Sequence, residues 1–268
     1  YDDAGRAKAL ATAYDAAQAA AALCAGATEA ERALIAALPA RYPQRVPVDL
    51  AQMADWDQSF AQVMQDTLAR FPNHLDIRSV TVEAAMTCTP WQMWDLPSGQ
   101  PAEGAQTALC QSLLEEGFAR LPQAWQHPGL LHLYVHLMEM SPTPEKALPQ
   151  ADVLRTLVPD AGHLVHMPSH IDVQCGAYRD VVYWNEQAIV ADEAYFDREG
   201  AFNIYTGYRQ HNYHFVIYGA MFLGQLEPAR RALRGMEATT PEALLRIESP
   251  PMADFFDNSI SYLPHVLV

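Results

Sequence analysis

Residues 161–178 read AGHLVHMPSHIDVQCGAY, a histidine-rich segment followed by a glycine at 176. Two of its histidines, 166 and 170, repeat an earlier pair that lies 34 residues upstream, His132 and His136. A period of 34 residues is the length of a structural repeat made of two antiparallel helices. Within each pair the spacing of four residues places both side chains on one face of a helix. The segment therefore predicts stacked helix pairs in which the histidines keep register with the repeat.

The composition of the chain favours helices and excludes several functions. Half of the 268 residues are hydrophobic, and long alternating runs of Val, Ile and Thr are missing, which favours an all-α protein. The formal charge of −15 argues against nucleic-acid binding, because that binding depends on Lys and Arg that neutralise phosphates. No apolar segment approaches the roughly 20 residues needed to span a bilayer. The four cysteines are far apart, so we expect neither a thiolate zinc site nor a disulfide framework.

Three histidine-rich segments carry a resemblance to a known family. The segments are residues 127–136, 161–170 and 211–215, and together they resemble tetratricopeptide (TPR) repeat proteins of bacteria and fungi. The similarity runs from about Glu31 to Arg231 and is most specific between Gly162 and His170. The resemblance implies an all-α, TPR-like helical-repeat solenoid, a right-handed superhelix of antiparallel helix pairs. The resemblance implies no particular reaction, because none is assigned to the family as a whole.

The TPR pattern also sets a register for the repeats. It has a glycine at about position 15 of each repeat and a small residue at about position 20. Gly176 at the first of these positions makes 162 the start of one repeat, and Gly224 has the same place in the next. We therefore expect the clearest repeats at about 128–161, 162–195 and 210–243, with about ten additional residues before the last.

The remaining parts of the chain show a less regular pattern. We expect helices near 2–23, 28–40, 50–71, 76–88 and 104–120, and a loop at 89–103 that is rich in Pro, Gly and Trp. The tail at 249–268 is expected to form a short helix or a cap. We expect one TPR-like domain over 1–268 with a truncated N-terminal part, because members of the family usually carry a further N-terminal repeat.

The resemblance implies that seven histidines line one groove. TPR proteins line their concave face with first-helix positions such as 2, 5 and 9, which here are His132, His136, His163, His166, His170, His211 and His214. Packed helices lie about 8–10 Å apart, so imidazoles from neighbouring helices can converge on one or two metal ions. Neutral imidazole is the commonest metal ligand in proteins. The alternative is that these histidines cap helices, stack on aromatic rings or bind a peptide.

Two carboxylates and one proline bear on the same site. Glu139 and Glu83 could each ligate a metal or orient an imidazole, or could stay solvated. Pro168 should kink its helix, because it cannot donate to the carbonyl of Leu164; the kink either re-aims His170 or is a tolerated distortion. A site with many imidazoles and few carboxylates favours copper first, then iron, then zinc.

The sequence thus predicts a metal-dependent enzyme with a histidine-rich site on the concave face of the solenoid. We expect an oxidoreductase that uses copper or iron, because a bound ion of this kind can activate dioxygen. No GxxxxGK[ST], GxGxxG, HExxH or Gly-x-Ser-x-Gly motif points to another chemistry. Three alternatives stay open: a zinc hydrolase, a TPR module that binds a protein or peptide, and a metal-storage protein without turnover.

The expected partner is a small molecule or a peptide held in the groove, with no nucleic acid and no membrane span. Four aromatic residues either form the wall of a substrate pocket beside the groove or pack between repeats: Trp91, Trp94, Tyr205 and Tyr208. We expect a soluble protein that is cytoplasmic, or periplasmic or secreted if a signal has been removed.

Overall fold

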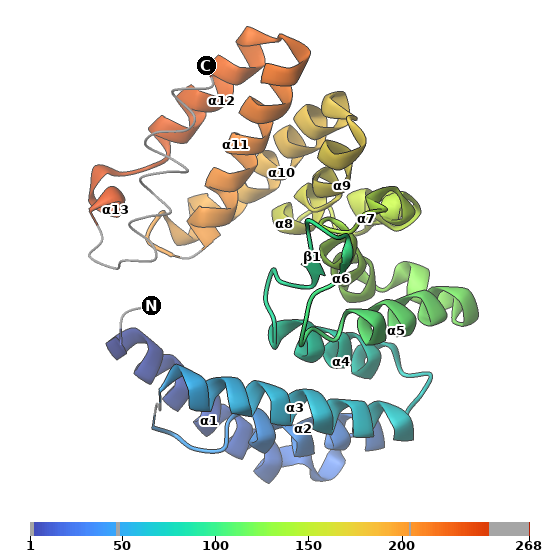
Figure 1. Ribbon diagram of the computed structural model, residues 1–268. Coiled ribbons are helices and arrows are strands. Elements are labelled where there is room, and N and C mark those ends of the chain that lie inside the picture. The colour runs from blue at the N-terminus through green and yellow to red at the C-terminus, as the bar shows by residue number, and fades with distance from the viewer. Residues whose placement is uncertain (1–2, 47–48, 204, 247–267) are drawn as a thin grey trace. The chain divides into compact units, whose positions relative to one another are not determined.

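The computed structural model describes residues 3–46, 49–203, 205–246 and 268, and these residues are mostly helical (Figure 1). The predicted all-α class is confirmed. Contacts divide the chain into two compact units, which we call unit 1 (Tyr1–Pro142) and unit 2 (Thr143–Val268). The tail expected at 249–268 lies outside the described residues, apart from Val268. None of the helices in the described ranges has the length and apolar character that a bilayer crossing requires.

Unit 1 starts with four helices whose positions follow the expected ones closely. They are α1 (Asp3–Leu23), with a short 3-10 helix η1 (Cys24–Gly26) after it, α2 (Glu29–Arg41), α3 (Leu50–Arg70) and α4 (Leu75–Thr87). Side-chain caps begin several of them: Thr28 and Glu31 form a capping box at α2, and Asp49 accepts from an N–H of α3. The helices enclose a core of small and aliphatic side chains that includes Ala61, Met64 and Ile77.

The second half of unit 1 contains the only β-strands within the described ranges. The expected loop at 89–103 holds a short antiparallel ribbon of β1 (Trp94–Asp95) and β2 (Gln100–Pro101). It leads to α5 (Thr107–Arg120), a 3-10 helix η2 (Pro122–Gln126) and α6 (Pro128–Met138). The indole N–H of Trp94 donates to the Leu137 carbonyl at 2.6 Å, which fixes the ribbon against the end of α6.

Unit 2 begins with short helices, continues with longer ones and ends, within the described residues, with a helix of four residues. They are η3 (Pro144–Ala147), α7 (Leu148–Leu157), α8 (Gly162–His166), α9 (Pro168–Cys175), α10 (Tyr178–Glu199), α11 (Tyr205–Leu223), α12 (Leu226–Ala238) and α13 (Glu242–Leu245). Gly176 (φ 75°) and Gly224 (φ 65°) end α9 and α11 in the left-handed conformation, at the two turns that the register predicted. Pro168 divides the expected first helix of its repeat into α8 and α9, since it lacks the N–H that would continue the helix.

Two kinds of packing hold unit 2 together. Helices α10, α11 and α12 lie side by side (Figure 1) over an apolar core that includes Ile189, Ile217 and Met236. Closer to the histidines, a buried ion pair joins α7 to α9: Arg155 donates to both carboxylate oxygens of Asp172 at 2.7 Å. These helix pairs have the alternation of a helical repeat, and assignment to a TPR solenoid stays a prediction.

Candidate metal centre

Three of the predicted histidines meet inside unit 2. His166 ends α8, His170 lies in α9 and His211 lies in α11. One ring nitrogen from each lies within 4.8 Å of the other two, and Nε2 of His166 is 2.9 Å from Nε2 of His170. His166 is fully buried, while the other two rings are half-buried. We call this set the three-histidine cluster.

A buried hydrogen-bond network fixes the orientation of the His166 ring. Asn185 on α10 donates through Nδ2 to the Val181 carbonyl at 2.7 Å and to the Ser169 hydroxyl at 2.8 Å. Its Oδ1 therefore faces His166 Nδ1, at 2.6 Å, and accepts a hydrogen bond from the N–H of that nitrogen. Because Nδ1 carries the proton, the lone pair of neutral His166 is on Nε2, the atom that faces His170. This is the arrangement in which a metal-binding histidine donates its other N–H to a carbonyl.

Electrostatics keep His166 in the neutral form that a metal requires. Burial holds the pKa of His166 well below its usual range, and the neighbouring His170 and His211 lower that pKa further, against the effect of the Asn185 hydrogen bond. A neutral imidazole can donate its lone pair to a metal ion, whereas a protonated one cannot.

One aromatic side chain packs against all three rings. The Phe215 ring centroid lies 4.7 Å from that of His166, 4.9 Å from that of His170 and 4.6 Å from that of His211. Phe215 follows His211 by one helical turn, so both project from the same face of α11. This ring provides an apolar wall on one side of the cluster.

The close approach of α8 to α10 positions the histidines on α8. Gly162 packs so tightly that a Cβ there would overlap the Asp192 carboxylate and lie 2.8 Å from the Ala188 carbonyl oxygen. Asp192 accepts hydrogen bonds from Tyr205 at 2.8 Å and Asn212 at 2.7 Å. Burial raises the pKa of Asp192 to about 6, despite the opposing effect of those two hydrogen bonds.

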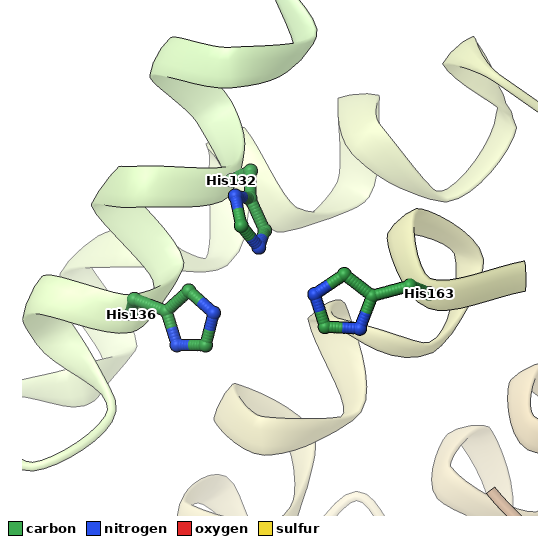
Figure 2. Close-up of side chains that lie close together, drawn as sticks. All are labelled: His132, His136 and His163. Atoms are coloured by element: carbon green, nitrogen blue, oxygen red, sulfur yellow. The ribbon is translucent and has the colours of Figure 1, made fainter. Parts of the chain in front are cut away.

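The other two predicted histidines of unit 2 lie outside the cluster. His163, labelled in Figure 2, is carried by α8. Its ring stacks on the His166 ring with centroids 6.2 Å apart, and it is tilted against the Tyr208 ring with centroids 4.7 Å apart. His214 on α11 is half-buried, and burial lowers its pKa. Neither belongs to the group of three ring nitrogens described above.

The predicted ligands of unit 1 lie on α4 and α6 and just after the end of α6. His132 and His136 lie on successive turns of α6 (Figure 2), with ring centroids 4.6 Å apart. His136 Nδ1 is 2.9 Å from Glu139 Oε1, so Glu139 orients an imidazole as the sequence suggested it could. Glu83 on α4 is exposed and lines the same pocket as the two histidines.

Sequence reasoning did not find Asn185, Ser169, Phe215 or Asp192. Phe215 follows a candidate ligand by one helical turn, and Ser169 directly precedes one on α9, so both left a local signal in the sequence. Asn185 and Asp192 come from α10, whose contact with the cluster depends on tertiary packing.

Replacement of Asn185 by leucine is expected to weaken metal binding by about 10- to 100-fold, because His166 loses the acceptor that fixes its ring and tautomer. Chelator-competition titration of the variant would measure this. The matched control is Gln187→Leu on the exposed face of the same helix, which should leave affinity unchanged. If the two variants had equal affinity for the metal, Asn185 would have no role in positioning His166 for metal binding.

Comparison of the chain with protein-family models, with curated proteins and with solved structures finds no match.

Proposed function

We propose that this protein is a metal-dependent enzyme, an oxidoreductase, that holds a copper or iron ion through His166, His170 and His211. The observation that supports this most is the convergence of three ring nitrogens within 4.8 Å of one another, one of them on a ring whose other nitrogen is already hydrogen-bonded. The TPR-like solenoid implied by the 34-residue period belongs to the same proposal.

The spacing of the nitrogens fits a metal ion. Bonds of about 2.0–2.1 Å from an ion to imidazole nitrogen require ligand nitrogens that lie roughly 3 to 4 Å apart. The His166 to His170 separation of 2.9 Å is close to that range, and the third nitrogen is within 4.8 Å of both.

The donor set favours a transition metal. All three donors are imidazoles, which suit copper, iron, zinc and nickel, whereas magnesium, calcium and manganese prefer oxygen ligands. Three protein ligands leave at least one coordination position for a substrate or dioxygen. When bound, copper or iron would supply one-electron chemistry at this position.

The surrounding residues have distinct parts in this proposal. Asn185 keeps His166 in the correct tautomer, and Phe215 limits access of water on one side of the rings. Tyr208 lies beside His163 at the edge of the cluster, where its exposed ring could contact a bound organic substrate.

Elemental analysis by mass spectrometry of untagged protein tests the proposal first. We expect one or two copper or iron atoms per chain, after which oxidation substrates would be screened. Zinc in the same amount would redirect the proposal to hydrolysis. Absence of metal, both after purification and after reconstitution with copper, iron and zinc, would overturn the proposal and leave the histidines as a binding surface.

A further inference from the structure

A pocket in unit 1 contains a second arrangement of histidines with the features of a metal site. It has a volume of about 270 Å³ and is lined by residues from α4, the β1 region and α6. We propose that this pocket binds a second transition-metal ion, copper in particular, through His132 and His136. Every residue that lines this pocket belongs to unit 1.

The first support is the pair of imidazoles. His132 and His136 are one helical turn apart on α6, and their rings meet nearly at right angles, at 77° (Figure 2). Two histidines spaced by four residues on one helical face can both contact one ion, which is how the helical HExxH motif presents two ligands to zinc. Both rings line the pocket.

The second support is the orientation of His136. Glu139, the C-cap residue that follows α6, is 8% exposed, and its Oε1 lies 2.9 Å from His136 Nδ1. An ionised carboxylate only accepts hydrogen bonds, so Nδ1 carries the proton and the lone pair of His136 is on Nε2. A carboxylate that fixes a histidine in this way is a common companion of protein metal ligands and raises the basicity of the coordinating nitrogen.

The third support is the composition of the pocket wall. Its apolar lining includes Trp91, Trp94, Met86 and Met140, and its charged lining residues are the two carboxylates Glu83 and Glu139. Among the described residues that line the pocket there is no Lys or Arg, so no fixed positive charge opposes a cation. Imidazole and thioether groups together favour copper over the hard divalent cations.

The backbone at the rim of the pocket is strained, which indicates that the surrounding structure fixes the position of Trp91. Trp91 has a φ of 55°, the only positive φ of a non-glycine residue in the described part of the chain, and its side chain is 74% exposed. A positive φ is unfavourable for a residue with a side chain, and such conformations are concentrated at functional sites. It places a large aromatic residue at the mouth of the pocket, and Trp94, anchored to Leu137, forms a fixed part of the wall.

The test uses the whole 268-residue chain with the three-histidine cluster disabled by His170→Ala and His211→Ala. Copper(II) is titrated while tryptophan fluorescence is recorded, and bound copper is measured after desalting. We expect about one copper per chain and quenching of fluorescence, because the pocket is lined by two indoles. Adding His132→Ala and His136→Ala should remove both the copper and the quenching.

Two controls separate this site from non-specific binding to an acidic protein. His127→Asn changes a histidine at the start of α6 outside the pocket and keeps a residue that can cap the helix, so it should change nothing. Trp91→Phe with Trp94→Phe should remove most of the quenching and keep the copper. Copper content that is unchanged by loss of His132 and His136 would overturn the proposal.

A further variant, Glu139→Gln, tests the role of the carboxylate. We expect copper affinity to fall by about 10- to 100-fold, because His136 loses its charged acceptor while both ligands stay in place. Unchanged affinity would show that Glu139 does not position His136. Because all these measurements are made without the three-histidine cluster, their failure would leave the proposed function of unit 2 intact.

Discussion

Replacement of both His170 and His211 by alanine is expected to abolish metal binding at the three-histidine cluster while the far-UV circular dichroism spectrum stays helical. The double variant leaves one imidazole, which cannot hold an ion firmly. Both side chains are half-buried, so their truncation should cost only about 1 kcal/mol each in stability. His166 is a poorer choice, because its removal would leave a cavity and deprive the buried Asn185 of a partner.

The measurement is metal content and affinity, by mass spectrometry after desalting and by chelator competition. His214→Ala is the matched control, because His214 lies on the same helix as His211 and is also half-buried but is not part of the cluster. We expect this control to keep its metal. Full metal content in the His170 and His211 double variant, with unit 1 also lacking His132 and His136, would show that the cluster binds no metal.

The helices could be predicted from the sequence because their signals are local. Caps such as Thr28 and Asp49, and the glycines at 176 and 224, act within a few residues of the positions they define. The division into two units could not be predicted in this way. It depends on contacts between distant residues, and the boundary at Pro142 falls inside a segment that the period assigns to one repeat.

The sequence predicted that histidines form the candidate site, but it did not predict which of the histidines meet. Periodicity indicated which histidines share a helix face, but not which rings meet, since that depends on helix packing and on the break that Pro168 introduces. As a result seven candidates gave one cluster of three in unit 2 and one pair in unit 1. The role of Asn185 could not be predicted, because an asparagine within α10 has no distinguishing pattern in the sequence.

Substitution of Gly162 by alanine is expected to cause a large loss of stability in unit 2, because an added Cβ meets closer neighbours there than at any other described glycine of that unit. The new Cβ would overlap the Asp192 carboxylate and approach the Ala188 carbonyl oxygen to 2.8 Å, and a backbone atom cannot rotate away as a side chain can. Overpacking of this kind costs about 3 kcal/mol or more. We expect the melting temperature of unit 2 to fall by roughly 6–12 °C.

The same substitution should also weaken metal binding, because it forces α8 away from α10 and so separates His166 from Asn185. Thermal melting followed by circular dichroism and chelator competition would measure the two effects. Gly26→Ala is the control, since Gly26 has no heavy atom within 4 Å of an added Cβ and needs no left-handed backbone. If Gly162→Ala melted and bound metal like Gly26→Ala, the contact between α8 and α10 could not be what holds His166 against its acceptor.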